Sequence, residues 1–220
     1  MLHFVLGGHS EFVYFVDPRN TIIFIMTSTQ AFIDTVFSQA RTANGFLSKP
    51  VPPELLRKVY DAAKMGPTSM NTQPTRYVFL TTPQAKSRLL PSLMLGNVDK
   101  TKEAPVTVIV ATDTRFYEFM PTVFPSNPNA RGLFESSPTL AAATANRNGT
   151  LGSGYFIVAA RAFGLDCGPM SGFDAAKLNE EFFPDGRWQA NYLINLGFGD
   201  KSKLLDRNPR LTFEQATETH

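Results

Sequence analysis

The stretch from Pro105 to Thr112 (PVTVIVAT) constrains the fold more than any other part of this sequence. It is a continuous apolar and β-branched run, without the polar alternation expected of a strand that has one face in water. It therefore predicts a central strand that is covered on both faces. Two further runs, Arg76 to Thr82 (RYVFLTT) and Tyr192 to Phe198 (YLINLGF), predict additional strands.

Helices are predicted around these strands from apolar residues at helical spacing, with Ser28 or Thr29 as the first N-cap. A turn is predicted at Gly96-Asn97 and a loop from Cys167 to Asp174. The most apolar helix is expected to be either central or at a dimer interface. The predicted helices cover residues 29–40, 52–65, 83–93, 140–163 and 174–182, which makes the fold class α+β.

The two least regular regions allow more than one interpretation. Residues 116–138 combine aromatic residues with prolines, which suits either a cap over a pocket or an extra piece of core. Residues 1–25 are apolar but contain charged residues, and they have neither an uninterrupted span of about 18 apolar residues nor a basic start. We predict a peripheral N-terminal extension over 1–25, with Met26 as a possible natural start, and a single domain over 26–220.

Histidine is absent from residue 10 to residue 219, which excludes Ser-His-Asp and Cys-His catalysis unless the chain ends fold into the site. A cofactor is therefore expected to carry the chemistry. The single cysteine, Cys167, excludes an internal disulfide and suits the cytoplasm. A net charge of +2 with 18% charged residues makes nucleic acid and membranes poor candidate partners, and no metal site is predicted.

Two polar segments and one set of basic residues are candidates for ligand binding. The junction from Gly66 to Phe79 offers uncharged hydrogen-bonding groups that suit a neutral heterocycle or a polyol, although an ordinary turn has the same composition. The segment from Gly168 to Gly172 could lie against a flat ligand, or simply connect two helices. Four basic residues could converge on a phosphate, although each alone is more often solvated: Arg41, Lys203, Arg207 and Arg210.

Taken in order, four motifs resemble the nitroreductase-like family of FMN flavoproteins. They are Arg41-Thr42, the segment 66–74 (GPTSMNTQP), the segment 164–174 (GLDCGPMSGFD) and Pro209-Arg210-Leu211. Within that family the chain looks most similar to the pyrimidine-utilisation branch, which is assigned to malonic semialdehyde reduction. The sequence departs from the family at Ser171, where an acidic residue is frequent, and near Gly45, where a lysine is frequent.

The resemblance implies a central mixed, mainly antiparallel sheet flanked by helices, in an interlocked homodimer with two FMN sites at the subunit interface. Arg41 and Arg210 would hold the phosphate, with Thr42, Lys100 and Arg207 in the same set, and Asn97 would reach the flavin ring or ribityl chain. The partner subunit would supply Pro67, Thr68, Ser69 and Asn71, whose polar groups should be unused within one subunit. The isoalloxazine would lie along Pro169, Met170, Ser171 and Gly172.

The implied activity is that of an FMN-dependent NAD(P)H oxidoreductase working by ping-pong hydride transfer. The sequence lacks a Rossmann fingerprint, and no catalytic side chain is required. With malonic semialdehyde as oxidant the product is 3-hydroxypropionate, and Arg115, Arg131 or Arg147 could pair with its carboxylate. The alternatives are a general nitroreductase or quinone reductase, and a flavin-binding protein without turnover.

Overall fold

The structure is a computed structural model that describes residues 4–6, 10–16, 22–26 and 29–220. In these residues the strands form two antiparallel sheets, one with the order β1-β2-β3 and one with the order β4-β5-β7-β6. The strands are β1 (Phe4–Leu6), β2 (Ser10–Val16), β3 (Ile22–Met26), β4 (Thr75–Leu80), β5 (Val106–Asp113), β6 (Asp166–Met170) and β7 (Trp188–Gly197). The predicted N-cap at Ser28 lies outside the described residues, as do parts of the predicted extension, and the domain boundary stays a prediction.

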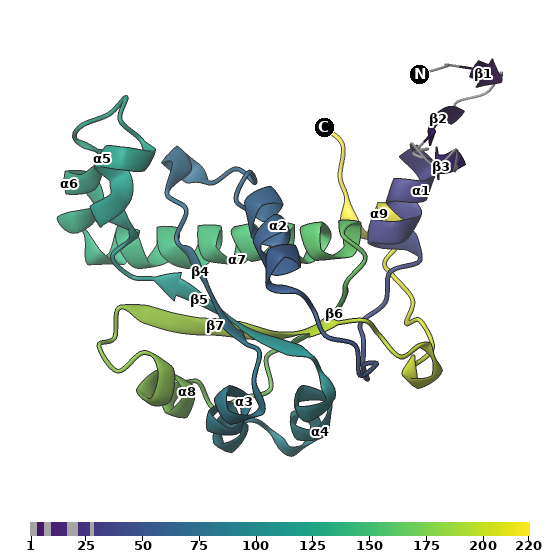
Figure 1. Cartoon of the computed structure of the whole chain (residues 1–220). Helices are drawn as coiled ribbons and strands as arrows, with labels where there is room; N and C mark the ends of the chain where they lie inside the picture. Colours follow the sequence, from purple (N-terminus) through teal and green to yellow (C-terminus); the bar gives the residue numbers. More distant parts are fainter. Residues whose placement is uncertain (1–3, 7–9, 17–21, 27–28) are drawn as a thin grey trace.

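Helices cover both faces of the β4-β5-β7-β6 sheet (Figure 1), with α2 and α7 on one side and α3, α4 and α8 on the other. The first helix, α1 (Thr29–Ile33), continues as a π-helix over Asp34–Ser38. The remaining α-helices are α2 (Pro53–Ala63), α3 (Pro83–Leu89), α4 (Leu95–Glu103), α5 (Met120–Val123), α6 (Ala130–Glu135), α7 (Pro138–Ala162), α8 (Ala175–Phe182) and α9 (Phe213–Ala216).

Strand β5 is the central strand that the sequence predicted. Every one of its residues is buried, and it pairs with β4 on one side and β7 on the other. Val108 belongs to the core cluster with Phe156 of α7, whereas Ile109 belongs to the cluster on the opposite face with Leu178 of α8. Because alternate residues of the strand enter separate cores, both faces need apolar side chains, which explains the continuous run.

Two local predictions are wrong. Gly96-Asn97 is not a turn but lies in the first turn of α4, where the Asn97 amide is buried and its Nδ2 donates to the Gly172 carbonyl at 2.8 Å. The residues from Cys167 to Met170 are not loop but most of strand β6. Pro169 is tolerated there because β6 is at the edge of the sheet, where an amide hydrogen on the outer side is not needed.

The aromatic region after β5 forms a piece of core of its own. Phe116, Met120 and Phe134 are almost fully buried and pack against the start of α7 through Ala141 and Ala145. This favours the extra-core interpretation of residues 116–138, although a cavity described below also borders the region. In the described part of the chain no helix has both the length and the apolar character needed to cross a membrane.

Candidate functional site

Arginines from two distant parts of the sequence meet at a surface cavity of about 390 Å³. Its wall is formed by the segment after the π-helix and by the C-terminal tail, and it includes four residues of the predicted phosphate set: Arg41, Thr42, Arg207 and Arg210. Asp206 is the acidic residue in the wall. The cavity therefore carries an excess of guanidinium groups, the arrangement that binds a phosphate dianion.

Backbone carbonyls hold these arginines within the subunit. Arg207 Nη2 donates to the carbonyls of Ser38 at 2.8 Å and Ala40 at 3.0 Å, and Arg41 Nη2 donates to the carbonyl of Leu205. The tail is thus tied to the end of the π-helix. Since neutral carbonyls leave the guanidinium charges uncompensated, the cavity stays cationic.

Arg161 is the fourth basic residue in the wall of this cavity, and sequence reasoning missed it. It lies in the last turn of α7, lines the same cavity and donates from Nη1 to the Val36 carbonyl at 3.0 Å. Its Nε is buried and has no hydrogen-bond partner among the described residues. A basic residue just before the helix-ending Gly164 was the available signal, because cations are favourable at helix C-termini.

Two other predicted basic residues do not line this cavity. Lys203 lies instead against Gly45, where an added Cβ would be 2.2 Å from Lys203 Cδ, and its ammonium pairs with Glu103 at 2.9 Å. Lys100 is half-buried on α4, one turn beyond Asn97. The structure therefore groups Lys100 with Asn97 rather than with the arginines.

A second group of predicted residues meets where the segment after β6 touches the start of α4. The Gly172 carbonyl accepts hydrogen bonds from the Met94 amide at 3.0 Å and from Asn97 Nδ2 at 2.8 Å. A Cβ on Gly172 would lie 2.6 Å from Asn97 Nδ2, so a larger residue here would displace the Asn97 amide from this hydrogen bond. Ser171 is exposed beside it, whereas Met170 is buried beneath.

A buried polar network fixes Met170 and α4 from below. Asn195 of β7 accepts from Thr107 Oγ1 at 2.9 Å and donates to Thr101 Oγ1 at 3.2 Å, and its Nδ2 also lies 4.0 Å from Met170 Sδ. All three polar residues are fully buried. Because every member has a partner, the network holds α4 in one position against the sheet.

Strand β6 connects the two groups. Thr42 forms a parallel bridge with Cys167, the Ala43 amide donates to the Cys167 carbonyl at 3.0 Å, and Met170 ends the strand four residues after its first residue, Asp166. At about 3.3 Å per residue the strand spans about 13 Å. An elongated ligand with an anionic end and an uncharged end would fit along this edge.

The predicted partner-subunit wall, Pro67 to Asn71, lies away from both groups. It follows α2, on the opposite side of the sheet from α4 (Figure 1). The backbone of this segment is unusual, because Met70, Asn71 and Gln73 all have positive φ angles of 51°, 53° and 42°. Three non-glycine residues in the left-handed region within one turn indicate stored strain, which is frequent at functional sites.

The expectation that the polar groups of this wall are unused within one subunit is wrong. Asn71 Nδ2 donates to the Val123 carbonyl at 2.7 Å, Thr68 Oγ1 accepts from the Gln73 amide, and the Ser69 amide donates to Asn148 Oδ1. These bonds stabilise the strained turn. Just after the wall, the buried Thr72 Oγ1 has no partner among the described residues.

Cys167 is buried in β6, and burial raises the pKa of its thiol to about 12. A thiol of this kind is protonated at neutral pH and is not a nucleophile. We expect almost no labelling of Cys167 when the folded protein is treated with iodoacetamide near pH 8, and full labelling in denaturant. Rapid labelling of the folded protein would contradict the buried position of β6.

Comparison with known proteins identifies the family of this chain. The model of the Nitroreductase family matches residues 38–198. A protein of Ralstonia nicotianae and one of Rhodopseudomonas palustris, both named "Putative NADH dehydrogenase/NAD(P)H nitroreductase", are 51% and 52% identical over 184 residues. In each case the match covers 84% of this chain, and it covers 94% and 93% of the relative.

Solved structures agree on the fold. A protein of Bacillus subtilis described as a "putative nitroreductase" aligns with a TM-score of 0.79 at 21% identity, covering 87% of this chain and 100% of that chain. A "putative nitroreductase" from Exiguobacterium sibiricum, solved in complex with FMN, has a TM-score of 0.77 at 17% identity, covering 86% of this chain and 97% of the other. The chain belongs to the Nitroreductase family, and the predicted fold is confirmed for the single chain, whereas the homodimer stays a prediction.

The residues present fit FMN. The arginine cavity suits the phosphate, and the contact of Gly172 with Asn97 offers an uncharged surface with close backbone approach for the ring. The orphaned Arg161 Nε and Thr72 Oγ1 are donors without partners, which is compatible with a missing ligand or subunit. Wall residues 67–71 do not complete the site within one chain.

Proposed function

We propose that this protein is an FMN-dependent NAD(P)H oxidoreductase that works by ping-pong hydride transfer. The observation that carries the proposal is the arrangement along β6, with an arginine cavity at one end and the glycine-lined contact of Gly172 with Asn97 at the other. Family membership supports the enzyme class and the cofactor, and the names of the relatives support NAD(P)H as the donor.

Each group of residues has its own task in this proposal. Arg41, Arg207 and Arg210, with Thr42 and Arg161, bind the phosphate. The flavin ring is oriented, and one of its faces is kept from water, by two groups of residues. These are Asn97 and Lys100 on α4, and Pro169 to Gly172 at the end of β6 and just beyond it. When bound, FMN supplies hydride acceptance and donation at N5. No side chain is needed as a nucleophile, in keeping with the inert Cys167.

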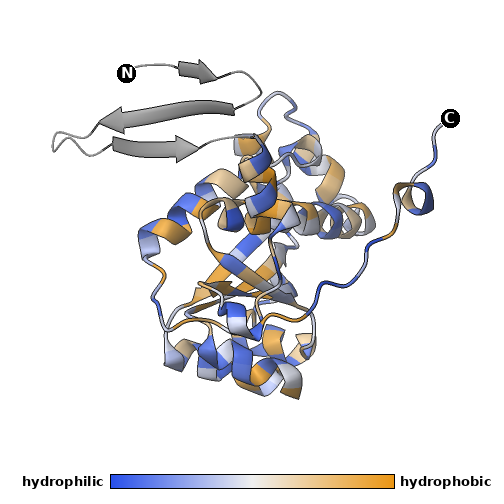
Figure 2. Ribbon diagram, turned by 90° about the vertical axis from the view of Figure 1, so that its right-hand side faces the viewer, coloured by the Kyte–Doolittle hydropathy of each residue, from blue (hydrophilic) through white to orange (hydrophobic). Residues whose placement is uncertain are grey.

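The proposal includes a homodimer in which Pro67, Thr68, Ser69 and Asn71 complete the partner's site. Several apolar side chains support it, because they are exposed in the single chain: Phe32, Phe37, Leu151, Tyr155, Leu211 and Phe213, with Phe37 52% exposed. The C-terminal segment also runs away from the body (Figure 2), as expected of a tail that embraces a second subunit. A monomeric mass for the flavin-loaded protein in sedimentation would count against this arrangement.

For the oxidant we propose malonic semialdehyde, on the basis of the sequence similarity to the pyrimidine-utilisation branch. Nitroaromatics and quinones are the second candidates, which the names of the relatives favour. We further propose that residues 26–220 form the functional domain in the cytoplasm, where NAD(P)H is available and Cys167 stays reduced.

Anaerobic mixing with NADH and NADPH tests the proposal. We expect a yellow protein whose flavin absorbance is bleached by at least one nicotinamide and restored by an oxidant, with acceptor rates measured for the aldehyde, a nitroaromatic and a quinone. A yellow protein that neither nicotinamide bleaches would indicate a flavin-binding protein without turnover. A colourless protein that takes up no added FMN would exclude both functions.

A further inference from the structure

A second cavity, of about 510 Å³, lies outside the proposed flavin site. It is bordered by the end of β5 with the residues that follow, by α6, by the start of α7 and by β7. Its volume is in the usual range for small-molecule sites, and its lining is mainly apolar with a few amides. Apart from Arg115, the lining includes Tyr117, Phe134, Pro138, Ala142, Asn146 and Asn191.

Arg115 is the basic residue in the lining of this cavity, and its positive charge is only weakly compensated. The ion pair that its guanidinium makes among the described residues is with Glu118, at 3.9 Å between Nε and Oε1. That carboxylate is shared, because Arg187 Nη1 lies 2.9 Å from Glu118 Oε2. Half of the Arg115 side chain is exposed, so the guanidinium can meet an anion without losing a strong partner.

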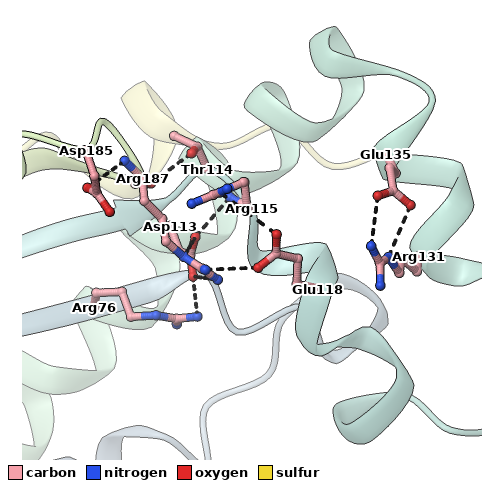
Figure 3. Close-up of polar contacts among 9 residues, drawn as sticks. All are labelled: Arg76, Asp113, Thr114, Arg115, Glu118, Arg131, Glu135, Asp185 and Arg187. Atoms are coloured by element: carbon pink, nitrogen blue, oxygen red, sulfur yellow. Dashed lines mark hydrogen bonds and ion pairs between the residues drawn. The ribbon is translucent and has the colours of Figure 1, made fainter.

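The backbone of Arg115 is fixed although its side chain is not. Its amide donates to Asp113 Oδ1 at 2.9 Å, and Asp113 is held by Arg76 and Arg187 (Figure 3). An anchored backbone beneath a weakly paired guanidinium lowers the ordering cost of binding.

The other charged side chains near the cavity are already engaged in ion pairs with each other. Glu135 lines it but accepts two hydrogen bonds from Arg131, at 2.9 and 3.1 Å, and this contact lowers the pKa of Glu135 (Figure 3). Arg131 is therefore engaged, and Arg147 is not part of the lining. Of the three arginines considered for a carboxylate, the structure singles out Arg115.

We propose that this cavity binds a small organic carboxylate, whose anion pairs with Arg115 and whose apolar body lies on Phe134, Pro138 and Ala142. The amides of Asn146 and Asn191 give a polar group on the ligand a partner. The proposal does not depend on FMN, because none of the residues proposed for the flavin lines the cavity. The carboxylate is either a regulatory metabolite or an oxidant that meets the flavin of the partner subunit, since the cavity lies apart from the flavin site of its own chain.

Calorimetric titration of the purified full chain tests the site, with phenylacetate as the probe and neutral phenylacetamide as its isostere. We expect phenylacetate to bind at least about tenfold more tightly than the amide, since a charge-assisted hydrogen bond adds roughly this much. Arg115→Gln should remove that difference, and Ala142→Phe should weaken both ligands by filling the cavity. Arg147→Gln, which removes the same charge outside the lining, should bind like the wild type.

Equal affinities for acid and amide, or unchanged phenylacetate binding in Arg115→Gln, would overturn the proposal. Loss of binding in Arg147→Gln to the same extent would overturn it too, because it would indicate a general charge effect. Measurements of steady-state turnover then show whether the carboxylate is an oxidant or a regulatory metabolite. Competition of phenylacetate with the oxidant assigns the cavity to the substrate, whereas a change in rate without competition assigns it to a regulator, and both results support the site.

Discussion

Replacing Asp113 with alanine should lower the free energy of unfolding by about 3 kcal/mol, the low end of the cost of removing one partner from a buried ion pair. The Asp113 carboxylate is 1% exposed and lies 2.7 Å from Arg76 Nη2 and 3.2 Å from Arg187 Nε. Without it, two guanidinium groups that are 20% and 24% exposed face each other across the ends of three strands. The Arg115 amide also loses its acceptor.

Glu135→Ala is the matched control, since it also removes a carboxylate from an arginine, but from a pair that is about half exposed. Exposed pairs add little, so its unfolding midpoint should stay near that of the wild type. Urea unfolding can be followed by the fluorescence of Trp188, the single tryptophan, which pairs with Asp113 in the β5–β7 register. Similar midpoints for the two variants would show that the Asp113 cluster does not stabilise the fold.

The sequence was most informative where one local signal dominates. The β-branched run of β5 predicted a strand covered on both faces. The prolines at 52 and 53 predicted the start of α2, because the amide hydrogen that proline lacks would have no acceptor in the helix at the first helical position. The helix over Asp174–Phe182 was predicted from its cap, and Asp174 does accept from the Lys177 amide at 3.1 Å. These signals depend on neighbouring residues alone.

The predictions failed where distant contacts override the local signal. Gly168 and Pro169 indicate a loop, yet pairing with Ile194 and Asn195 of β7 makes them part of an edge strand. Gly96-Asn97 indicates a turn, yet the bond from Asn97 to the Gly172 carbonyl, 75 residues away, holds it in a helix. Neither partner can be inferred from the residues adjacent in sequence.

The candidate site also contains some residues that the sequence predicted and others that only the fold reveals. The ordered motifs identified Arg41 and Arg210, the basic character of the tail suggested Arg207, and the fold brings all three to one cavity. Arg161 was missed because it belongs to none of these motifs and reaches the cavity only through the packing of α7 against the π-helix. The strain at Met70, Asn71 and Gln73 was equally invisible, because left-handed backbone at non-glycine residues is imposed by tertiary contacts.

If β6 positions the cofactor as proposed, Gly168→Ala should reduce FMN affinity by about tenfold or more, since forcing a methyl into a packed contact costs about 1–3 kcal/mol. An added Cβ at Gly168 would lie 2.6 Å from the Ala43 carbonyl oxygen, and a backbone atom cannot move aside as a flexible side chain can. Ala43 follows Thr42, which bridges to β6, so displacing it moves Arg41 and Thr42 relative to the cavity.

Gly132→Ala is the control, because an added Cβ there meets no atom within 4 Å and alanine is the better helix former. The affinity of each apoprotein for added FMN can be measured by flavin fluorescence, with far-ultraviolet circular dichroism to confirm that both variants are folded. A folded Gly168→Ala protein that binds FMN as tightly as the Gly132→Ala protein would place the phosphate site elsewhere. Weaker binding in Gly168→Ala alone would tie cofactor affinity to the close approach of residues 41–43 to β6, a contact that only a glycine at position 168 permits.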